Sequence, residues 1–323
     1  MTQEFPAGPG PAPAGPAAGS GAVLVMGEAL IDLVPSPDGP ETYAAQPGGA
    51  PANVAAGLAR LGTPSWFAGA LGGDGFARLI ERRLASAGTE LGLCARSELP
   101  TTLAVADPGP DGTGYHFHLA DTATFRLPDH SARVDRFAAV YVGGLAAVVD
   151  PAAEAVAATA RAGAARSLLV VDPNVREDRT LDPVEGLRRL RELCALAQVV
   201  KASDEDLARL WPDAGPEETC RRLAEAGTLV VLTRGARGAT AYTRDDGPVS
   251  VPAVPVTVVN TIGAGDAFTA GVLHWLRTTG AHVEGGALRL DREQVTAMLG
   301  FAAQVAASVC AQSGTEPSLP ART

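Results

Sequence analysis

The second half of the chain alternates between short apolar runs and longer segments with helical periodicity. The apolar runs have the length and the β-branched composition of buried strands. The segments between them place apolar residues three and four positions apart, as amphipathic helices do. Repeated units of this kind predict a parallel sheet with helices on both faces. The predicted strands are residues 137–142, 167–171, 198–201 and 228–233, and the predicted helices are residues 151–162, 183–195, 204–211 and 217–226.

The first half of the chain has a different pattern. Residues 1–21 are rich in Pro, Gly and Ala, and we expect them to be disordered because they lack the large apolar side chains that offset ordering. A buried strand is predicted next, and short alternating strands separated by turn residues are predicted from residue 101 to residue 127. The other predictions are strands at residues 22–26 and 66–71 and helices at residues 52–61 and 76–87.

Residues 254–271 join an apolar run to a helix through a glycine turn. Residues 254–259 are mostly valine and predict a strand, and helical spacing begins at Asp266. The turn between them contains Gly263-Ala264-Gly265. The first amides of a helix lack internal partners and carry the positive end of its dipole, so this turn is suited to binding an anion. Asp266 is either an ordinary acid of the first helical turn or a group that acts on the bound anion.

Polar residues elsewhere interrupt apolar patterns. Asp32 lies in an alternating apolar run, where a carboxylate is costly unless it meets a partner or a ligand; it either caps a turn or binds a ligand. Asn53 falls in the first turn of the predicted helix 52–61, where it can act as an N-terminal cap. His116 and His118 share one face of a predicted strand, but they lack further ligands at the spacing of a zinc site.

Composition narrows the classes of function. The chain has 323 residues, 46% hydrophobic and 19% charged, which suits one large globular domain. Its formal net charge of −10, without a basic cluster, argues against nucleic acid or an anionic membrane as a partner. Lys201 is the only lysine, which excludes a P-loop. Because no apolar run reaches membrane-spanning length and the cysteines are widely spaced, we expect a cytoplasmic protein with reduced thiols.

Two motifs connect these features to a known family. The segment Gly48-Gly49-Ala50-Pro51-Ala52-Asn53-Val54-Ala55 and the later Gly263-Ala264-Gly265-Asp266 together resemble both signatures of the ribokinase-like (PfkB) carbohydrate kinases, closest to fructokinase-like members. The resemblance implies a three-layer α/β/α, Rossmann-like (ribokinase-like) fold over residues 22–320, with a small β-sheet lid from about residues 29–46 and 97–127. It also implies an ATP-dependent kinase that phosphorylates a primary hydroxyl of a small sugar, with fructose as the expected acceptor.

The resemblance assigns roles on the acceptor side of the site. Asp266 is expected to be the catalytic base, and the amides of Gly263, Ala264 and Gly265 are expected to form an anion hole for the transferred group. His118 is expected to line the sugar pocket, and Arg176, which follows Asp172-Pro173-Asn174, is expected to lie near the sugar or the triphosphate. The remaining residues expected to bind the sugar are Asp32, Gly48, Gly49 and Asn53.

The resemblance also assigns the nucleotide side. Asp206 is expected to hold Mg²⁺ through water, although Ser203-Asp204-Glu205-Asp206 equally suits an ordinary capped helix start. Asn260 stands where the family has an aspartate that helps to bind K⁺, so we expect weak or absent activation by K⁺. The closing residues 314–320 resemble the family's ending beside the adenine. The residues expected to bind ATP are Lys201, Ser203, Thr233, Gly235, Gly238 and Gly265.

Other functions remain open at this point. Residues Thr122-Ala123-Thr124 depart from the fructokinase pattern in the lid, which leaves 2-keto-3-deoxygluconate, ribose or a nucleoside as alternative acceptors. A non-catalytic regulator that binds a sugar or a nucleotide is an alternative of another class. Asp266 argues against it, because binding alone needs no base beside an anion. The expected partners are a small sugar and ATP, and a homodimer is expected by analogy with family lids.

Overall fold

The computed structural model describes residues 16, 21–36, 39, 41–109, 112–176, 181–280, 283–284, 287–312 and 314. Within these residues the largest sheet has eight strands, in the order β14-β13-β12-β11-β10-β9-β1-β4. The strands from β12 to β4 pair in parallel, whereas β13 is antiparallel to both of its neighbours, β12 and β14. In chain order the strands are β1 (Val23–Met26), β4 (Ser65–Ala68), β9 (Ala139–Gly143), β10 (Leu168–Asp172), β11 (Val199–Ser203), β12 (Leu229–Thr233), β13 (Ala239–Tyr242) and β14 (Val249–Val251).

The central strands are apolar along their length because both faces of the sheet are covered. Val23 and Val25 of β1 belong to one hydrophobic core, and Leu24 and Met26 belong to the other. All four side chains are fully buried. Since successive side chains of a strand point to opposite faces, a sheet buried on both sides reads as a continuous apolar run.

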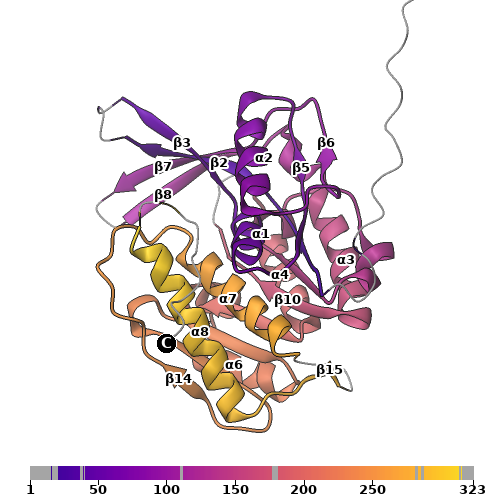
Figure 1. Ribbon diagram of the computed structural model, residues 1–323, viewed down its shortest axis with the longest axis vertical. Helices are drawn as coiled ribbons and strands as arrows, with labels where there is room; N and C mark the ends of the chain where they lie inside the picture. The colour runs from indigo at the N-terminus through magenta and orange to yellow at the C-terminus, as the bar shows by residue number, and fades with distance from the viewer. Residues whose placement is uncertain are drawn as a thin grey trace, which may run out of the picture.

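Helices cover the two faces and give the molecule three layers (Figure 1). The first core joins the strands to α1 (Ala50–Arg60), α2 (Gly75–Ala87), α7 (Ala264–Thr278) and α8 (Arg292–Cys310). The second core joins them to α3 (Ala152–Arg166), α4 (Pro183–Leu196), α5 (Asp204–Leu210) and α6 (Pro216–Glu225). The predicted three-layer α/β/α, Rossmann-like architecture is therefore confirmed.

A second, four-stranded sheet within the described residues projects from the N-terminal half, on the left in Figure 1. Its strands are, in order, β3 (Tyr43–Gly48), β2 (Leu30–Pro35), β7 (Leu103–Gly109) and β8 (Gly112–His118). The neighbours β2 and β7 are parallel, and the outer pairs are antiparallel. We call this sheet the lid. Because β3 ends at Gly48 and α1 begins at Ala50, the lid leads directly into the helix that carries Asn53.

The predicted strand at residues 66–71 is divided in two. β4 ends at Ala68, and β5 (Ala70–Leu71) pairs with β6 (Ala95–Arg96). A Cβ atom on Gly69 would lie 2.5 Å from the ring of Phe67 and 2.9 Å from the carbonyl oxygen of Gly27, so only glycine fits at this bend. The remaining short elements are the pair β15 (Val283–Glu284) and β16 (Ala287–Leu288) and the 3₁₀ turns η1 (Ala123–Phe125), η2 (Ser131–Arg136), η3 (Leu145–Ala147) and η4 (Gly235–Arg237).

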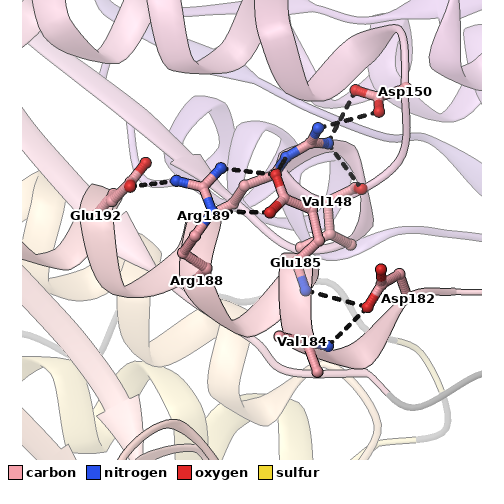
Figure 2. Close-up of polar contacts among 8 residues, drawn as sticks. All are labelled: Val148, Asp150, Asp182, Val184, Glu185, Arg188, Arg189 and Glu192. Carbon is pink, nitrogen blue, oxygen red and sulfur yellow. Dashed lines mark hydrogen bonds and ion pairs between the residues drawn. The ribbon is translucent and has the colours of Figure 1, made fainter.

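A network of charged side chains attaches helix α4 to the loop that follows β9 (Figure 2). Asp182 caps the N-terminus of the helix. Arg189 donates to both carboxylate oxygens of Asp150, at 2.8 and 3.0 Å, and to the carbonyl oxygen of Val148. Glu185 accepts a further hydrogen bond from Arg189. Exposed ion pairs contribute little to stability, so this network mainly fixes how α4 lies beside the end of β9.

The predicted strand at residues 254–259 is wrong. Residues 252–260 form no strand, and the side chains of Val258 and Val259 are 61% and 59% exposed. Pro255 has no amide hydrogen for a strand ladder, and β14 already occupies the edge of the sheet. The segment is held instead by the amide of Val259, which donates to the carbonyl oxygen of Cys310 at 2.8 Å. Valine content alone therefore misled the prediction.

Two predictions fall outside the described residues. These are the disordered tail at residues 1–21, apart from residues 16 and 21, and the closing segment at residues 315–320. Among the helices of the described part of the chain, none has the length and apolar character needed to cross a membrane.

Candidate active site

Asp266 lies in the first turn of α7, immediately after the glycine turn. Gly263 is the N-cap residue and has φ +79°, a left-handed conformation that favours glycine. The side chain of Asp266 is buried, and burial raises its pKa above the ordinary range. Hydrogen bonding by Asn53 and the charge of Lys201 oppose this rise. A buried carboxylate with a raised pKa at a helix N-terminus is suited to accepting a proton.

Asn53 connects helix α1 to Asp266. Its Nδ2 atom donates to Oδ2 of Asp266 at 2.7 Å. The N-cap residue of α1 is Gly49, so the interpretation of Asn53 as a helix cap is wrong. The Oδ1 atom of Asn53 accepts from Nη1 of Arg83 at 2.8 Å, and the same nitrogen donates to the carbonyl oxygen of Pro47. Asn53 therefore has a fixed orientation, with the NH₂ group of its side-chain amide directed at the carboxylate of Asp266.

Asp32 lies on the lid strand β2, and the negative charge of Asp266 acts on its carboxyl group. Burial raises the pKa of Asp32 to about 6, with the charge of Asp266 as the next cause. A Cβ atom on Gly48 would lie 1.9 Å from Oδ2 of Asp32, so any other residue would force this carboxylate to move. Gly49 has φ +95°, and a Cβ atom there would lie 2.7 Å from the carbonyl oxygen of Glu28. The glycine pair thus allows Asp32 to lie directly over the backbone at the start of α1.

Arg176 supplies positive charge to the same region. It follows Asn174, which has φ +41°, and its Nη1 atom donates to the carbonyl oxygen of Val175. Its charge opposes the rise in pKa at Glu28, Asp32 and Asp266. The predicted placement of Arg176 beside the expected sugar site agrees with these influences.

Lys201 approaches the glycine turn from the strand β11. Its Nζ atom is 3.0 Å from Oδ2 of Asp172. A Cβ atom on Gly265 would lie 3.3 Å from the same nitrogen. The structure therefore brings Lys201 to the start of α7, beside the backbone of the predicted anion hole. The amide of Ala264, one of the predicted donors, instead donates to the carbonyl oxygen of Thr261 at 3.2 Å.

The ends of β11 and β12 bring the other predicted nucleotide residues to one edge. Ser203 pairs in register with Thr233, so both lie at the carboxyl ends of neighbouring parallel strands. Ligands of open α/β sheets bind at this edge. Gly235 and Gly238 follow with φ +53° and +83°. At Gly238 a Cβ atom would lie 2.2 Å from the carbonyl oxygen of Val251, which gives this glycine a packing role as well.

Comparison with known proteins shows the family to which the chain belongs. A model of the family described as pfkB family carbohydrate kinase matches residues 21–322. The chain belongs to the pfkB carbohydrate kinases. A fructokinase from Rhizobium leguminosarum bv. trifolii is 33% identical over 263 residues, which cover 79% of this chain and 79% of that protein. A fructokinase from Escherichia coli is 32% identical over 315 residues, which cover 94% and 97%.

A solved structure supports the same assignment. The fructokinase from Vibrio cholerae O395, in its form with fructose, ADP and calcium ion bound, is 28% identical to this chain. The TM-score is 0.79, and the match covers 93% of this chain and 96% of that one. The pfkB kinase described here is thus an ATP-dependent carbohydrate kinase, and its chemistry calls for ATP and a divalent metal.

The carboxylates of this kinase fit a metal that is held mainly by the nucleotide. Among the described residues, no group of three or more His, Cys, Asp or Glu side chains could hold a metal ion alone. Asp206 accepts from Ser203 at Oδ2 and from the amide of Val175 at Oδ1, so it forms the capping box that the sequence allowed as an alternative. Kinase Mg²⁺ is commonly bound through phosphates, waters and one or two carboxylates, which suits a buried acid that acts through water.

His118 lies apart from the other predicted residues of the kinase site. It pairs with Leu103 across the lid, whereas Asp32 pairs with Ala104, so His118 and Asp32 are on opposite faces. His118 is exposed. The geometry thus gives no support to a place for His118 in the sugar pocket. The alternating residues Tyr115 and Phe117 share the face of Asp32, and they are the aromatic residues that the alternation could have identified.

Two further residues, Arg83 and Glu28, make contacts that the motifs did not indicate. Nothing in the sequence marked Arg83, whose Nη1 atom donates to Oδ1 of Asn53. Glu28 accepts hydrogen bonds from the amides of Leu145 and Ala146 at 3.2 and 3.0 Å. Burial raises the pKa of Glu28 to about 7. Its signal was a carboxylate immediately after a buried strand, where a polar group needs partners.

Asn260, which is expected to lie near a monovalent cation, takes part in local hydrogen bonds. The Oδ1 atom of Asn260 accepts from the amide of Ile262 at 3.0 Å. The amide of Asn260 lies 3.3 Å from the carbonyl oxygen of Cys310, at the end of α8. The carbonyl of the Asn260 side chain therefore shapes the turn before Gly263, and its role in binding K⁺ stays a prediction.

Proposed function

We propose that this chain transfers the γ-phosphoryl group of ATP to a primary hydroxyl of fructose. The observation that carries the proposal is the hydrogen bond from the side-chain amide of Asn53, which orients Asp266 at the start of α7. Relatives that cover most of the chain are named fructokinases, and the similar structure of the Vibrio cholerae fructokinase holds fructose and ADP. A base, an acceptor site and an anion site at one place are the parts that phosphoryl transfer requires.

The sugar would lie between the lid and the start of α1. Asp32 accepts hydrogen bonds from its hydroxyl groups, and the backbone of Gly48 and Gly49 allows close approach. On the side of the sugar opposite Asp32, Asn53 holds Asp266 in place through its hydrogen bond to the carboxylate. Tyr115, on the lid face of Asp32, covers the acceptor and limits its size. Burial and the charge of Asp32 raise the pKa of Tyr115, which agrees with a position close to that carboxylate.

Asp266 would act as the general base. As the primary hydroxyl oxygen bonds to the γ-phosphorus, the bond from phosphorus to the β-bridging oxygen breaks, ADP leaves, and Asp266 holds the proton of the hydroxyl. Its raised pKa makes it a stronger base than an ordinary aspartate. The amides at Gly263 and Gly265 stabilise the charge on the transferred group at the positive end of the α7 dipole.

The nucleotide would extend along the edge formed by β11 and β12. Lys201 and the backbone of Gly265 meet the γ-phosphate, and Ser203, Thr233, Gly235 and Gly238 follow toward the rest of ATP. Mg²⁺ is the divalent metal we propose, and it supplies charge neutralisation between the β- and γ-phosphates. Asp206 holds it through water.

A panel of acceptors tests the proposal. ADP release from ATP and Mg²⁺ is followed with fructose, glucose, ribose, 2-keto-3-deoxygluconate and adenosine. We expect the highest kcat/KM with fructose. A clear preference for another member of the panel would replace fructose as the acceptor but keep the kinase. Binding of sugar and ATP without turnover on any member would contradict the proposed function and favour a binding protein.

A further inference from the structure

Asp172 and Lys201 form an ion pair in the interior of the protein. Asp172 ends β10, Lys201 lies on the adjacent strand β11, and Nζ is 3.0 Å from Oδ2. The side chains of Lys201 and Asp172 are 6% and 0% exposed. A buried ion pair adds little stability in comparison with apolar residues of the same volume. The presence of this buried ion pair therefore suggests a functional role for the charge of Lys201.

The ammonium group is directed at the first turn of α7. The Cβ position of Gly265 would be 3.3 Å from Nζ, so the glycine leaves space for the lysine. The hydroxyl of Thr269, one helical turn later, is 3.1 Å from Oδ2 of Asp172 and 3.0 Å from the carbonyl oxygen of Gly265. One carboxylate oxygen of Asp172 thus contacts both β11 and α7. Its other oxygen has no hydrogen-bond partner among the described residues.

We propose that Asp172, supported by Thr269, is the positioning residue that holds the Lys201 ammonium group at the anion hole, where it meets the γ-phosphoryl group of ATP. This inference rests on the proposed function for the identity of the nucleotide. Without Asp172, the flexible side chain of Lys201 would lose the hydrogen bond that holds its ammonium group beside Gly265. Asp172 acts through Lys201 and touches no substrate itself.

The charged groups around Lys201 agree with this role. Burial disfavours its ammonium form, but the charges of Asp172, Asp206 and Asp266 and the hydrogen bond to Asp172 outweigh burial and leave the pKa of Lys201 raised. Burial also raises the pKa of Asp172, with Lys201 as the main opposing influence, so the two groups titrate together. The surrounding carboxylates thus favour the charged form of Lys201 and raise its pKa in spite of burial.

Equilibrium binding separates a γ-phosphoryl contact from a general loss of structure. ATP and ADP affinities are measured without sugar for the wild-type protein and for Lys201→Met, which keeps the length of the side chain. We expect Lys201→Met to weaken ATP binding about tenfold or more, because a charge-assisted contact is lost. ADP binding should stay within about twofold, since ADP has no γ-phosphoryl group.

A double-mutant cycle tests whether Asp172 acts through Lys201. Asp172→Asn should show the same selective loss of ATP affinity and kcat, with unchanged ADP and sugar affinity. In the Lys201→Met background, Asp172→Asn should cost nothing further. The double variant also removes both buried charges together, so it folds even where a single variant leaves one charge unpaired.

Thr269 and the pH dependence supply controls that a purely structural role would not change. Thr269→Val should lower kcat modestly, whereas Thr269→Ser keeps the hydroxyl and should behave as the wild type. In Asp172→Asn the pKa of Lys201 falls, because burial then acts without its closest counter-charge. ATP affinity should therefore decline at a lower alkaline pH than in the wild type.

The outcomes distinguish this inference from the proposed function. Equal losses of ATP and ADP affinity, or a full additional loss from Asp172→Asn in the Lys201→Met background, would overturn the positioning role. Absence of sugar-dependent ADP release in the wild type would contradict the kinase reaction instead. The binding measurements need no turnover, so they decide the role of Asp172 in either case.

Discussion

The side-chain amide of Asn53 donates a hydrogen bond of 2.7 Å to the carboxylate of Asp266, although the two residues are 213 positions apart in the sequence. The contact joins the start of α1, which the lid leads into, to the start of α7, where the anion is expected. It orients the side chain of Asp266, the proposed base, and opposes the rise in its pKa that burial causes. This hydrogen bond therefore joins the proposed acceptor site to the proposed anion site.

Asn53→Ala should reduce kcat by roughly 10- to 100-fold, because a buried hydrogen bond to a charged group is worth about 1.5–3 kcal/mol. The pKa of Asp266 should rise further once this hydrogen bond is lost. Since the base must be ionised, kcat should then decline at a higher pH as the solution is acidified. A pH–rate profile of the wild type and the variant checks both effects.

Two neighbouring arginines give the matched control for that profile. Arg83→Met removes the guanidinium group that holds Asn53, and it should reproduce part of the loss in kcat. Arg82→Met changes the adjacent, exposed side chain of α2 and should leave kcat unchanged. An unaltered acid limb in Asn53→Ala would show that Asn53 does not orient the base.

Gly48→Ala should raise KM for the sugar by tenfold or more while ADP affinity stays the same. The new Cβ atom would lie 1.9 Å from Oδ2 of Asp32, so the carboxylate must leave its position over the backbone. Gly215→Ala is a suitable control, because nothing lies within 4 Å of the added atom. Equal sugar affinities in the Gly48 variant and the wild type would mean that Asp32 does not contact the sugar.

Sugar affinity, measured without nucleotide, should decrease as the pH falls through about 6, the pKa to which burial raises Asp32. The ionised carboxylate accepts hydrogen bonds from hydroxyl groups, and protonation removes part of that capacity. In Asp266→Asn the midpoint should move to lower pH, because a like charge that raises the pKa of Asp32 is lost. Calorimetric titration at a series of pH values tests the sign, and a midpoint that moves upward would contradict it.

Potassium should activate the enzyme weakly or not at all. Asn260 offers a carbonyl oxygen, which already accepts from Ile262, but it lacks the negative charge that favours a bound cation. Asn260→Asp should create or strengthen activation when KCl replaces a tetramethylammonium salt at constant ionic strength. Strong activation of the wild type would refute this expectation.

The sequence predicted the main sheet and helices well, because strands buried on both faces are apolar throughout and their helices are amphipathic. The error at residues 254–259 came from weighing valine above Pro255, which cannot extend a ladder. Asp266 and Asn53 were identified through motifs. Their contact depends on how α1 packs against α7, and nothing local in the sequence encodes that.

In the lid, too, the sequence of a single strand does not show which of its faces lies beside Asp32. Alternation placed His116 and His118 on one face, but only the register with β7 reveals that Asp32 lies on the other. Register depends on pairing between distant segments, and a shift by one residue reverses the faces. Arg83 likewise contacts Asn53 only through the tertiary structure, and the spacing of residues along α2 does not predict this contact.

The most direct test is fructose-dependent ADP release by the wild type and by Asp266→Asn. Asparagine keeps the shape of the side chain but cannot take the proton of the acceptor hydroxyl. The account predicts loss of kcat by roughly 10²–10⁴-fold, with fructose and ADP still bound at wild-type affinity. Turnover near the wild-type rate in Asp266→Asn would contradict the central claim that Asp266 is the catalytic base.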